Sequence, residues 1–242
     1  MTFRVERHSS VASTMDLAAQ AAASGAAEGL VIVAGTQTAG RGRRGRPWVS
    51  PPGAGLYLSL LLRPTAAAIR VLTLGAGVGV RDGIRRATGL ETTLKWPNDV
   101  LAGGRKISGV LAEGHALGTA RQAVVLGIGL NLRPAACPPD LAGVATSLEA
   151  ELGRPVDDEA VLTAVLAAVG EVYEDLSGGR ADDILRRWRE AAPGAVGSVV
   201  EWDGPDGLRT GLTDGIDDDG ALRVRTADGA VTLSAGEVRL RR

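Results

Sequence analysis

Uninterrupted apolar runs constrain this 242-residue chain most, because such runs must be buried wherever they lie in the fold. Residues 30–36, LVIVAGT, have the length of a strand and no polar alternation, which predicts a β-strand covered on both faces. Residues 55–63, GLYLSLLLR, predict the next strand, and three more follow at residues 93–96, 106–114 and 123–132. We therefore expect a sheet in the interior of the molecule.

Helical segments alternate with these strands. Residues 13–25, STMDLAAQAAASG, predict a helix with Ser13 or Thr14 as N-cap, Asp16 in the first turn and Gly25 as terminator. Further helices are predicted over residues 66–88, 158–176 and 181–191, and residues 3–8 predict a first strand. The fold class is α/β (α+β), a mixed β-sheet domain packed with helices over residues 1–193.

The pattern changes after residues 192–198, APGAVGS, which indicate a boundary. The remaining segment alternates short strands with Asp-Gly and Pro-Asp-Gly turns, typical of a small β-barrel of about fifty residues. We expect residues 194–242 to form a C-terminal SH3-like β-barrel domain.

Charge and cysteine content exclude several classes of protein. The chain carries 27 Lys+Arg against 28 Asp+Glu, so it is not generally basic. No apolar run approaches the roughly 20 residues that span a bilayer, and the first residues lack the apolar core of a secretory signal. The single cysteine, Cys137, excludes a disulfide framework within the chain and is interpreted as an incidental thiol. A cytoplasmic location fits these features.

Lysine is rare in this chain. Lys95 and Lys106 are its two lysines, and every other basic side chain is arginine. A lysine that persists where arginine is freely used can reflect a need for a compact point charge, which the planar guanidinium cannot supply. The alternative is chance retention on the surface. We treat the pair as an indication of a site.

Residues 40–48, GRGRRGRPW, place four arginines and three glycines within seven positions. Glycines let a backbone approach a ligand, and arginines offer forked donors suited to carboxylate and phosphate. Three interpretations stay open: a solvated basic loop, a nucleic-acid contact, and a lid over an anionic ligand. The loop lies between two predicted buried strands and lacks the interleaved aromatic residues of a stacking platform, which favours the lid.

Residues 94–114 add the second charged feature. Pro97, Asn98 and Asp99 form a predicted turn, and LAGGRK is interpreted as a hairpin connection. Lys95 would end one strand and Lys106 would open the next, so the two ammonium groups could converge on one anion. Solvated lysines at strand ends are the ordinary alternative.

Together these motifs resemble the biotin protein ligase family. STM, TQTAGRGRRGRPW, KWPNDV, KISGVLAEG and LGIGLNL occur in the family's order and spacing, and GIDDDGALRV and GEVRL resemble its C-terminal barrel. The resemblance covers nearly the whole chain. It implies an enzyme that activates biotin with ATP as biotinyl-5'-AMP, releases pyrophosphate, and transfers biotin to a lysine of a biotin carboxyl carrier protein.

The resemblance also implies site residues. Two anions meet in the first step, so the site must supply fixed positive charge, and MgATP is the expected nucleotide. The catalytic residues implied are Arg43, Lys95 and Lys106. Biotin-binding residues would be Ser13, Thr14, Met15, Gln37, Arg41, Gly42, Arg43 and Lys95. ATP-binding residues would be Arg41, Arg43, Trp48, Asn98, Lys106 and Asn131, and the metal ligands are not identified.

One position departs from the family pattern, which reads Ser-Thr-Asn where this chain has Met15. An amide that could contact the biotin ring is absent there. Only twelve residues precede Ser13, so we expect the enzyme-only form, without a helix-turn-helix domain and without specific DNA binding. Neither His8 nor His115 lies in a metal-ligand pattern. A homodimer is compatible with the sequence, since strand edges leave no unambiguous signature.

Two other functions are alternatives to this one. A lipoate-type protein ligase would run the same adenylation on another acid, and the Gly/Arg motif and the barrel favour biotin. An RNA-binding module would use the Arg-Gly loop with the small barrel. The acidic DDDG segment in that barrel, residues 217–220, argues against RNA.

Overall fold

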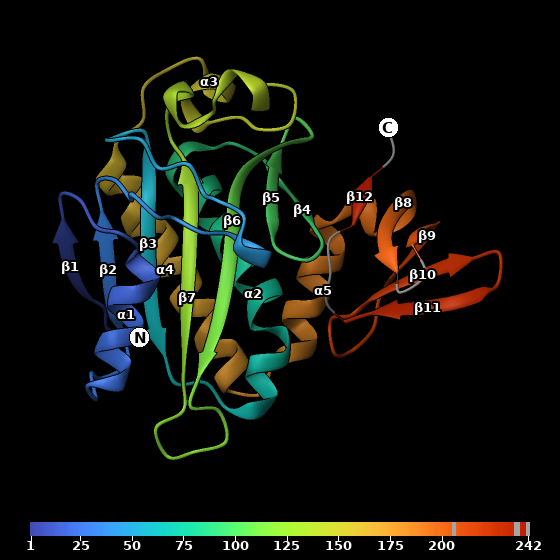
Figure 1. The fold of residues 1–242 in the computed structure, drawn as a ribbon, viewed down its shortest axis with the longest axis horizontal. Coiled ribbons are helices and arrows are strands. Elements are labelled where there is room, and N and C mark those ends of the chain that lie inside the picture. Colours follow the sequence, from blue (N-terminus) through green and yellow to red (C-terminus); the bar gives the residue numbers. More distant parts are fainter. Residues whose placement is uncertain (205–206, 235–237, 241–242) are drawn as a thin grey trace.

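A computed structural model describes residues 1–204, 207–234 and 238–240 of the chain. Figure 1 shows a large sheet with helices against it and a smaller β-structure beside it. The larger sheet has seven strands in the order β1-β2-β3-β7-β6-β5-β4, with β1 and β2 parallel and every other pair antiparallel. Its strands are β1 (Arg4–His8), β2 (Leu30–Ala34), β3 (Gly55–Leu62), β4 (Thr93–Lys95), β5 (Asp99–Ala102), β6 (Arg105–His115) and β7 (Ala123–Asn131). The mixed α/β class predicted from the sequence is confirmed.

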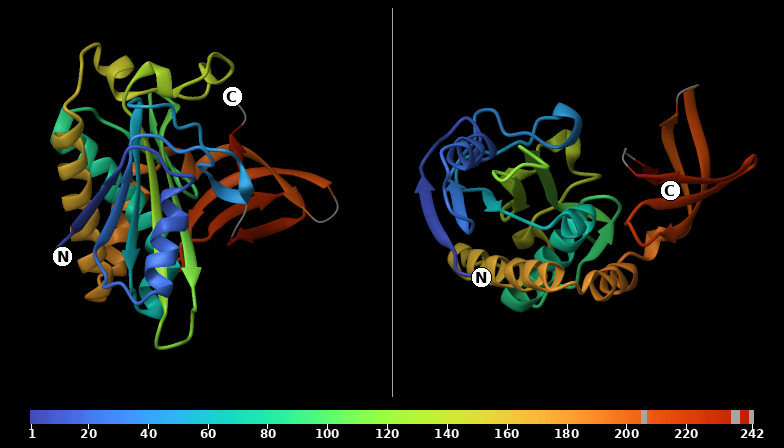
Figure 2. Two further views of the ribbon diagram at one scale, coloured as in Figure 1. Left: turned by 60° about the vertical axis from the view of Figure 1, so that its left-hand side comes forward. Right: turned by 90° about the horizontal axis from the view of Figure 1, so that it is seen from below.

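Both faces of β2 are buried, as its apolar run predicts. Val31 and Val33 face a core shared with helices α2 (Ala66–Thr88), α4 (Asp158–Ser177) and α5 (Ala181–Ala191). Leu30 and Ile32 face a second core under helix α1 (Thr14–Ala23). Figure 2 shows α1 and the α4–α5 layer on opposite sides of the sheet.

Glycines in α2 allow that helix to pack closely on α4. A Cβ added at Gly79 would lie 2.8 Å from the Cα of Val169, and one at Gly83 would lie 2.5 Å from the Cα of Val165. Either contact would push the helices apart. The glycines that weaken α2 as a helix therefore serve its packing.

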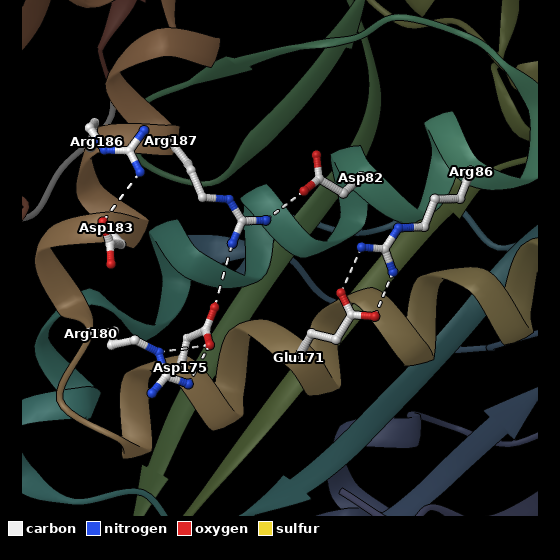
Figure 3. Close-up of polar contacts among 8 residues, drawn as sticks. All are labelled: Asp82, Arg86, Glu171, Asp175, Arg180, Asp183, Arg186 and Arg187. Atoms are coloured by element: carbon white, nitrogen blue, oxygen red, sulfur yellow. Dashed lines mark hydrogen bonds and ion pairs between the residues drawn. The ribbon is translucent and has the colours of Figure 1, made fainter.

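Ion pairs tie the three outer helices together (Figure 3). Asp82 of α2 is 6% exposed and accepts from Arg187 of α5 at 2.6 Å. Arg86 of α2 makes a two-pronged pair with Glu171 of α4, at 2.7 and 2.6 Å. This network lies on the helical side of the sheet.

The C-terminal segment forms a second, five-stranded sheet in the order β11-β10-β9-β8-β12. Its antiparallel strands are β8 (Val196–Gly204), β9 (Gly207–Ile216), β10 (Leu222–Thr226), β11 (Gly229–Leu233) and β12 (Arg239–Leu240). The small antiparallel β-structure predicted for the C-terminal segment is confirmed. Pro205 and Asp206 of the predicted turn, and Gly236 and Glu237 of the GEVRL motif, lie outside the described residues.

Two short elements, one helix and one strand, are not predicted from the sequence. Helix α3 (Leu148–Leu152) has five residues, between the N-cap Ser147 and the left-handed Gly153. Strand β5 was interpreted as part of a connection; it is the first arm of a hairpin that turns at Gly103 and Gly104. In the part of the chain that the structure describes, four short 3₁₀ turns complete the elements: Arg43–Gly45, Pro134–Ala136, Pro139–Leu141 and Pro193–Ala195.

The intervening strand corrects the expectation that Lys106 opens the strand directly after Lys95. Lys95 ends β4, while Lys106 is the second residue of β6, one strand later. Among the described helices, none combines the length and apolar character needed to cross a membrane.

Candidate active site

A pocket of about 1000 Å³ lies between the Gly/Arg loop and the face of β5, β6 and β7. The start of α1 closes one end, and residues 136–145 form part of the opposite wall. Every site residue predicted from the sequence lines this pocket except Ser13. Those lining it are Thr14, Met15, Gln37, Arg41, Gly42, Arg43, Trp48, Lys95, Asn98, Lys106 and Asn131.

A chain of hydrogen bonds fixes the α1 end of the pocket. The backbone N–H and the hydroxyl of Thr14 both donate to the Gln37 Oε1, at 2.9 and 3.1 Å. The Thr14 hydroxyl also contacts the buried Ser59 hydroxyl at 2.8 Å. Since Gln37 Oε1 accepts, its Nε2 donates, and it does so to Ser50 Oγ at 3.1 Å. This end therefore presents oriented polar groups on a rigid base.

Met15 lies beside these polar groups. Its side chain is 4% exposed, and a Cβ added at Gly127 of β7 would lie 2.5 Å from its Sδ. The Met15 thioether therefore packs directly on the backbone of Gly127, which has no side chain to separate them. Ser13 is buried at the N-cap of α1, but its hydroxyl makes no capping bond. It accepts a hydrogen bond from Arg41 Nη1 at 3.1 Å.

The Arg41 guanidinium is held by acidic side chains. Nε and Nη2 donate to the two carboxylate oxygens of Glu113 on β6, at 3.0 and 2.9 Å. Nη1 donates to Asp16 of α1 at 2.7 Å. The hydrogen bond that Arg41 donates to Glu113 raises the pKa of Arg41 well above its usual range, and the one it donates to Asp16 adds to this. Arg41 is therefore a fixed cation.

The Gly/Arg loop is closed by backbone bonds at its base. Trp48 N–H donates to Gly40 C=O at 2.8 Å, and Gly42 N–H donates to Arg46 C=O at 2.7 Å. Inside this ladder the chain turns, with Arg44 in the left-handed region at φ 56°. Such a conformation strains a residue that carries a Cβ. The loop thus has a paired base and a turned tip.

The Trp48 ring packs against glycines of the sheet. A Cβ at Gly129 of β7 would come within 2.3 Å of the Trp48 ring, and one at Gly109 of β6 within 3.1 Å. Lys106 Nζ is 5.3 Å from the ring centroid, within the range of a cation–π contact. It also pairs with Asp99 Oδ1 at 2.6 Å. Glycines at paired strand positions therefore make a floor for an indole and an ammonium group.

The two asparagines predicted for the site both line the pocket, and each also donates a hydrogen bond to a backbone carbonyl. Asn98 Nδ2 donates to Val110 C=O at 2.7 Å. Asn131 Nδ2 donates to Thr146 C=O at 3.0 Å and contacts Cys137 Sγ at 3.4 Å. Burial raises the pKa of the Cys137 thiol, and the hydrogen bond from Asn131 opposes this.

The wall over residues 136–145 was not recognised from the sequence. It brings Leu141 and Val144 to the pocket, 38% and 57% exposed. Backbone bonds join this wall to Lys106, whose N–H donates to Val144 C=O and whose C=O accepts from Thr146 N–H, both at 2.8 Å. Val238 and Arg239 near the C-terminus also line the pocket. Isolated apolar residues in a loop carry no periodic signal that could have indicated this role.

Metal ligands are not gathered in a cluster. Among residues 1–204, 207–234 and 238–240, no group of three His, Cys, Asp or Glu side chains is placed to hold a metal ion. Asp99 and Asp140 are the carboxylates among the pocket-lining residues that the structure describes. Lys95 lines both this pocket and a smaller cavity against the second sheet.

Two protein families match the chain. The Biotin/lipoate A/B protein ligase family matches residues 8–131, and the family described as Biotin protein ligase C terminal domain matches residues 205–241. The first match contains the Gly/Arg loop and both lysines. The second falls on the smaller sheet.

Individual proteins match over most of their length. The Bifunctional ligase/repressor BirA of Bacillus subtilis (strain 168) is 35% identical over 237 residues, which cover 96% of this chain and 73% of that protein. The Biotin--[acetyl-CoA-carboxylase] ligase of Mycobacterium tuberculosis is 35% identical over 240 residues, 92% of this chain and 83% of that protein. The solved structure of the biotin protein ligase from Aquifex aeolicus in complex with biotin and ATP superposes with a TM-score of 0.84, at 29% identity, and 99% of each chain is covered.

Proposed function

This chain belongs to the biotin/lipoate A/B protein ligase family, and we propose that it is a biotin protein ligase. A carboxylate oxygen of biotin attacks the α-phosphorus of ATP, and pyrophosphate leaves. The amine of a carrier lysine then attacks the acyl carbon of biotinyl-5'-AMP, and AMP leaves. One observation carries the proposal: a single pocket gathers the Gly/Arg loop, both lysines and an oriented polar end.

The α1 end of the pocket is proposed to take the biotin ring. Thr14 and Gln37 supply polar groups there, and Gln37 is held in one orientation by its own hydrogen bonds. Met15 supplies packing where the family pattern has an amide, so ring recognition rests on the neighbouring groups. Ser13 acts through Arg41, and the backbone at Arg41 and Gly42 closes over the ligand.

The lysine end is proposed to take the reacting carboxylate and the α-phosphate. Lys106 supplies a point charge above the Trp48 face, and Lys95 and Arg43 add positive charge from the lining of the same pocket. Donors fixed before the reaction stabilise developing negative charge most effectively. We propose Lys106, Lys95 and Arg43 as the catalytic residues.

The adenine is proposed to lie between Trp48 and the wall over residues 136–145. Leu141 and Val144 leave apolar surface exposed there, which a nucleobase would cover. Asn98 and Asn131 line the same region. Magnesium is proposed to arrive as MgATP, since Mg²⁺ in such sites is held by phosphate oxygens, waters and one or two carboxylates, and Asp99 can provide one.

Partners and location are also proposed. The carrier is a biotin carboxyl carrier domain, and the enzyme acts in the cytoplasm. We propose a homodimer, because β1 ends the order of the larger sheet with one edge open in the single chain. Light scattering tests this, and the expected molar mass in solution is that of two chains. Residues 1–193 and 194–242 are proposed as two domains.

The chain is proposed not to bind DNA specifically. Its formal net charge is −1, which gives no general attraction to phosphate backbones. A gel-shift assay on the upstream region of its own biotin genes tests this, and nanomolar, sequence-selective binding would contradict it.

The direct test of the enzyme is incubation with biotin, MgATP and a carrier domain, followed by mass measurement of the carrier. We expect the mass increase of one biotin and release of pyrophosphate. Lipoate in place of biotin tests the related activity, which should be absent or far slower. Modification by lipoate alone would replace the proposal.

A further inference from the structure

We propose that Arg41 is the fixed anchor of the Gly/Arg loop, and that Glu113 and Asp16 are positioning residues for biotin binding. The inference rests on the proposed function and assigns roles within the same site. Arg41 carries the first positive charge of the loop, and the sequence suggests a ligand contact for it. The geometry points to a different use of its guanidinium.

The donors of Arg41 are almost all used within the protein. An arginine has five N–H donors. Four of them are taken, by the two carboxylate oxygens of Glu113, by Asp16 and by Ser13, at distances between 2.7 and 3.1 Å. A paired fork of this kind is the strongest geometry an arginine makes. Little capacity is left for a phosphate or a carboxylate of a ligand.

These contacts join three separate elements. Glu113 belongs to β6, Asp16 to the first turn of α1, and Arg41 to the loop between β2 and β3. The same turn of α1 carries Thr14, which orients Gln37. Arg41 therefore fixes the start of the loop to the polar end of the pocket.

The backbone supports the division into an anchor and a tip. Arg41 pairs with Pro47 in an isolated bridge, next to the bond between Trp48 and Gly40. Residues 43–45 extend beyond this ladder, which also includes the bond from Gly42 N–H to Arg46 C=O. The carboxylates of Glu113 and Asp16 also neutralise the charge of Arg41. This lowers the repulsion among the four arginines of the loop.

Partial exposure limits the size of the effect. The side chains of Arg41 and Glu113 are 28% and 32% exposed, and that of Asp16 is 51% exposed. Solvent screens such pairs, so Asp16 should contribute less than Glu113. If loss of Glu113 reduces the population of the ordered loop to about a tenth, the apparent Kd for biotin rises about tenfold.

The test is Glu113→Gln, which removes the charge and keeps the shape of the side chain. Glu171→Gln is the matched control, because Glu171 forms an equally two-pronged pair with Arg86 on the helical side of the sheet. Hydrogen exchange of the unliganded proteins reports the loop base at residues 40–42. Calorimetry reports biotin affinity.

We expect Glu113→Gln to exchange faster at residues 40–42 and to bind biotin about tenfold more weakly, with Asp16→Asn showing a smaller change in the same direction. Glu171→Gln should match the wild type in both measurements. Unchanged exchange and unchanged biotin affinity in Glu113→Gln would overturn the inference, as would faster exchange with unchanged affinity. Failure of the wild-type protein to bind biotin would instead refute the proposed function, and the exchange result would still test the anchor.

Discussion

Replacement of Lys106 by arginine should slow adenylate formation while the fold survives. Lys106 Nζ sits 2.6 Å from Asp99 Oδ1 and 5.3 Å from the Trp48 ring centroid. A Cβ placed at Gly109 would meet the end of this lysine at 3.0 Å, so the side chain runs closely over the floor. The longer, planar guanidinium cannot occupy the same position.

The expected loss can be estimated from the displacement. Moving a unit charge from about 4 to about 6 Å from the phosphate, at an effective dielectric constant of about 20, costs about 1.4 kcal/mol. Loss of one aligned, charge-assisted hydrogen bond costs about 1.5 kcal/mol more. The sum of about 3 kcal/mol corresponds to a rate about a hundredfold lower. Lys95→Arg should also weaken biotin binding, because Lys95 ends β4 and lines the same pocket.

The assay is pyrophosphate release at saturating biotin and MgATP. Lys106→Met separates the two contributions, since it removes the charge but keeps a similar length, and it should be slower than Lys106→Arg. Thermal melts control for folding, because Lys106→Met leaves the Asp99 carboxylate, which is 19% exposed, without its 2.6 Å partner. Folded Lys106→Arg and Lys95→Arg proteins with near wild-type rates would refute the placement of the reacting groups.

Three further predictions follow from other parts of the structure. Biotin with ATP should slow hydrogen exchange over residues 40–48, and equal protection with and without ligands would count against a lid. Gly129→Ala should raise the KM for ATP by a factor about ten times larger than the factor for biotin, because the added Cβ would lie 2.3 Å from the Trp48 ring and displace it. Steady-state kinetics with each substrate varied in turn tests this. Asp82→Ala should lower the free energy of unfolding by about 2 kcal/mol in urea titrations, since it leaves Arg187 without its 2.6 Å partner; an unchanged midpoint would show that the pair is not stabilising.

Much of the sheet could be predicted because its signals are local. The run in β2 is apolar at every position, and the structure covers both of its faces. Helix α2 was predicted with the bounds the structure gives, residues 66–88, although its glycines lower helix propensity. Glycine is required at positions 79 and 83 because α4, about ninety positions later in the chain, packs against them. Packing across such a separation leaves no local pattern.

The parts of the pocket that were missed depend on contacts between distant segments. Leu141 and Val144 lie in a loop without periodicity, and their position follows from backbone bonds to Lys106. Arg41 was singled out as a cation for a ligand, because a sequence shows the charge but not its partners. Glu113 and Asp16, which take up its donors, are ordinary acidic residues on a strand and a helix.

The rarity of lysine was the most informative composition signal, and the structure gives Lys106 a physical reason to resist replacement. Its ammonium group contacts a carboxylate and an indole above glycines, where only a slender side chain fits. Arg105, the preceding residue, pairs with Glu151 at 2.6 Å and does not line the pocket. Two adjacent residues of β6 therefore have different roles. The Arg105 guanidinium pairs with the Glu151 carboxylate outside the pocket, and the Lys106 ammonium group lines the pocket. Arg105→Lys should therefore reduce activity far less than Lys106→Arg in the same pyrophosphate assay.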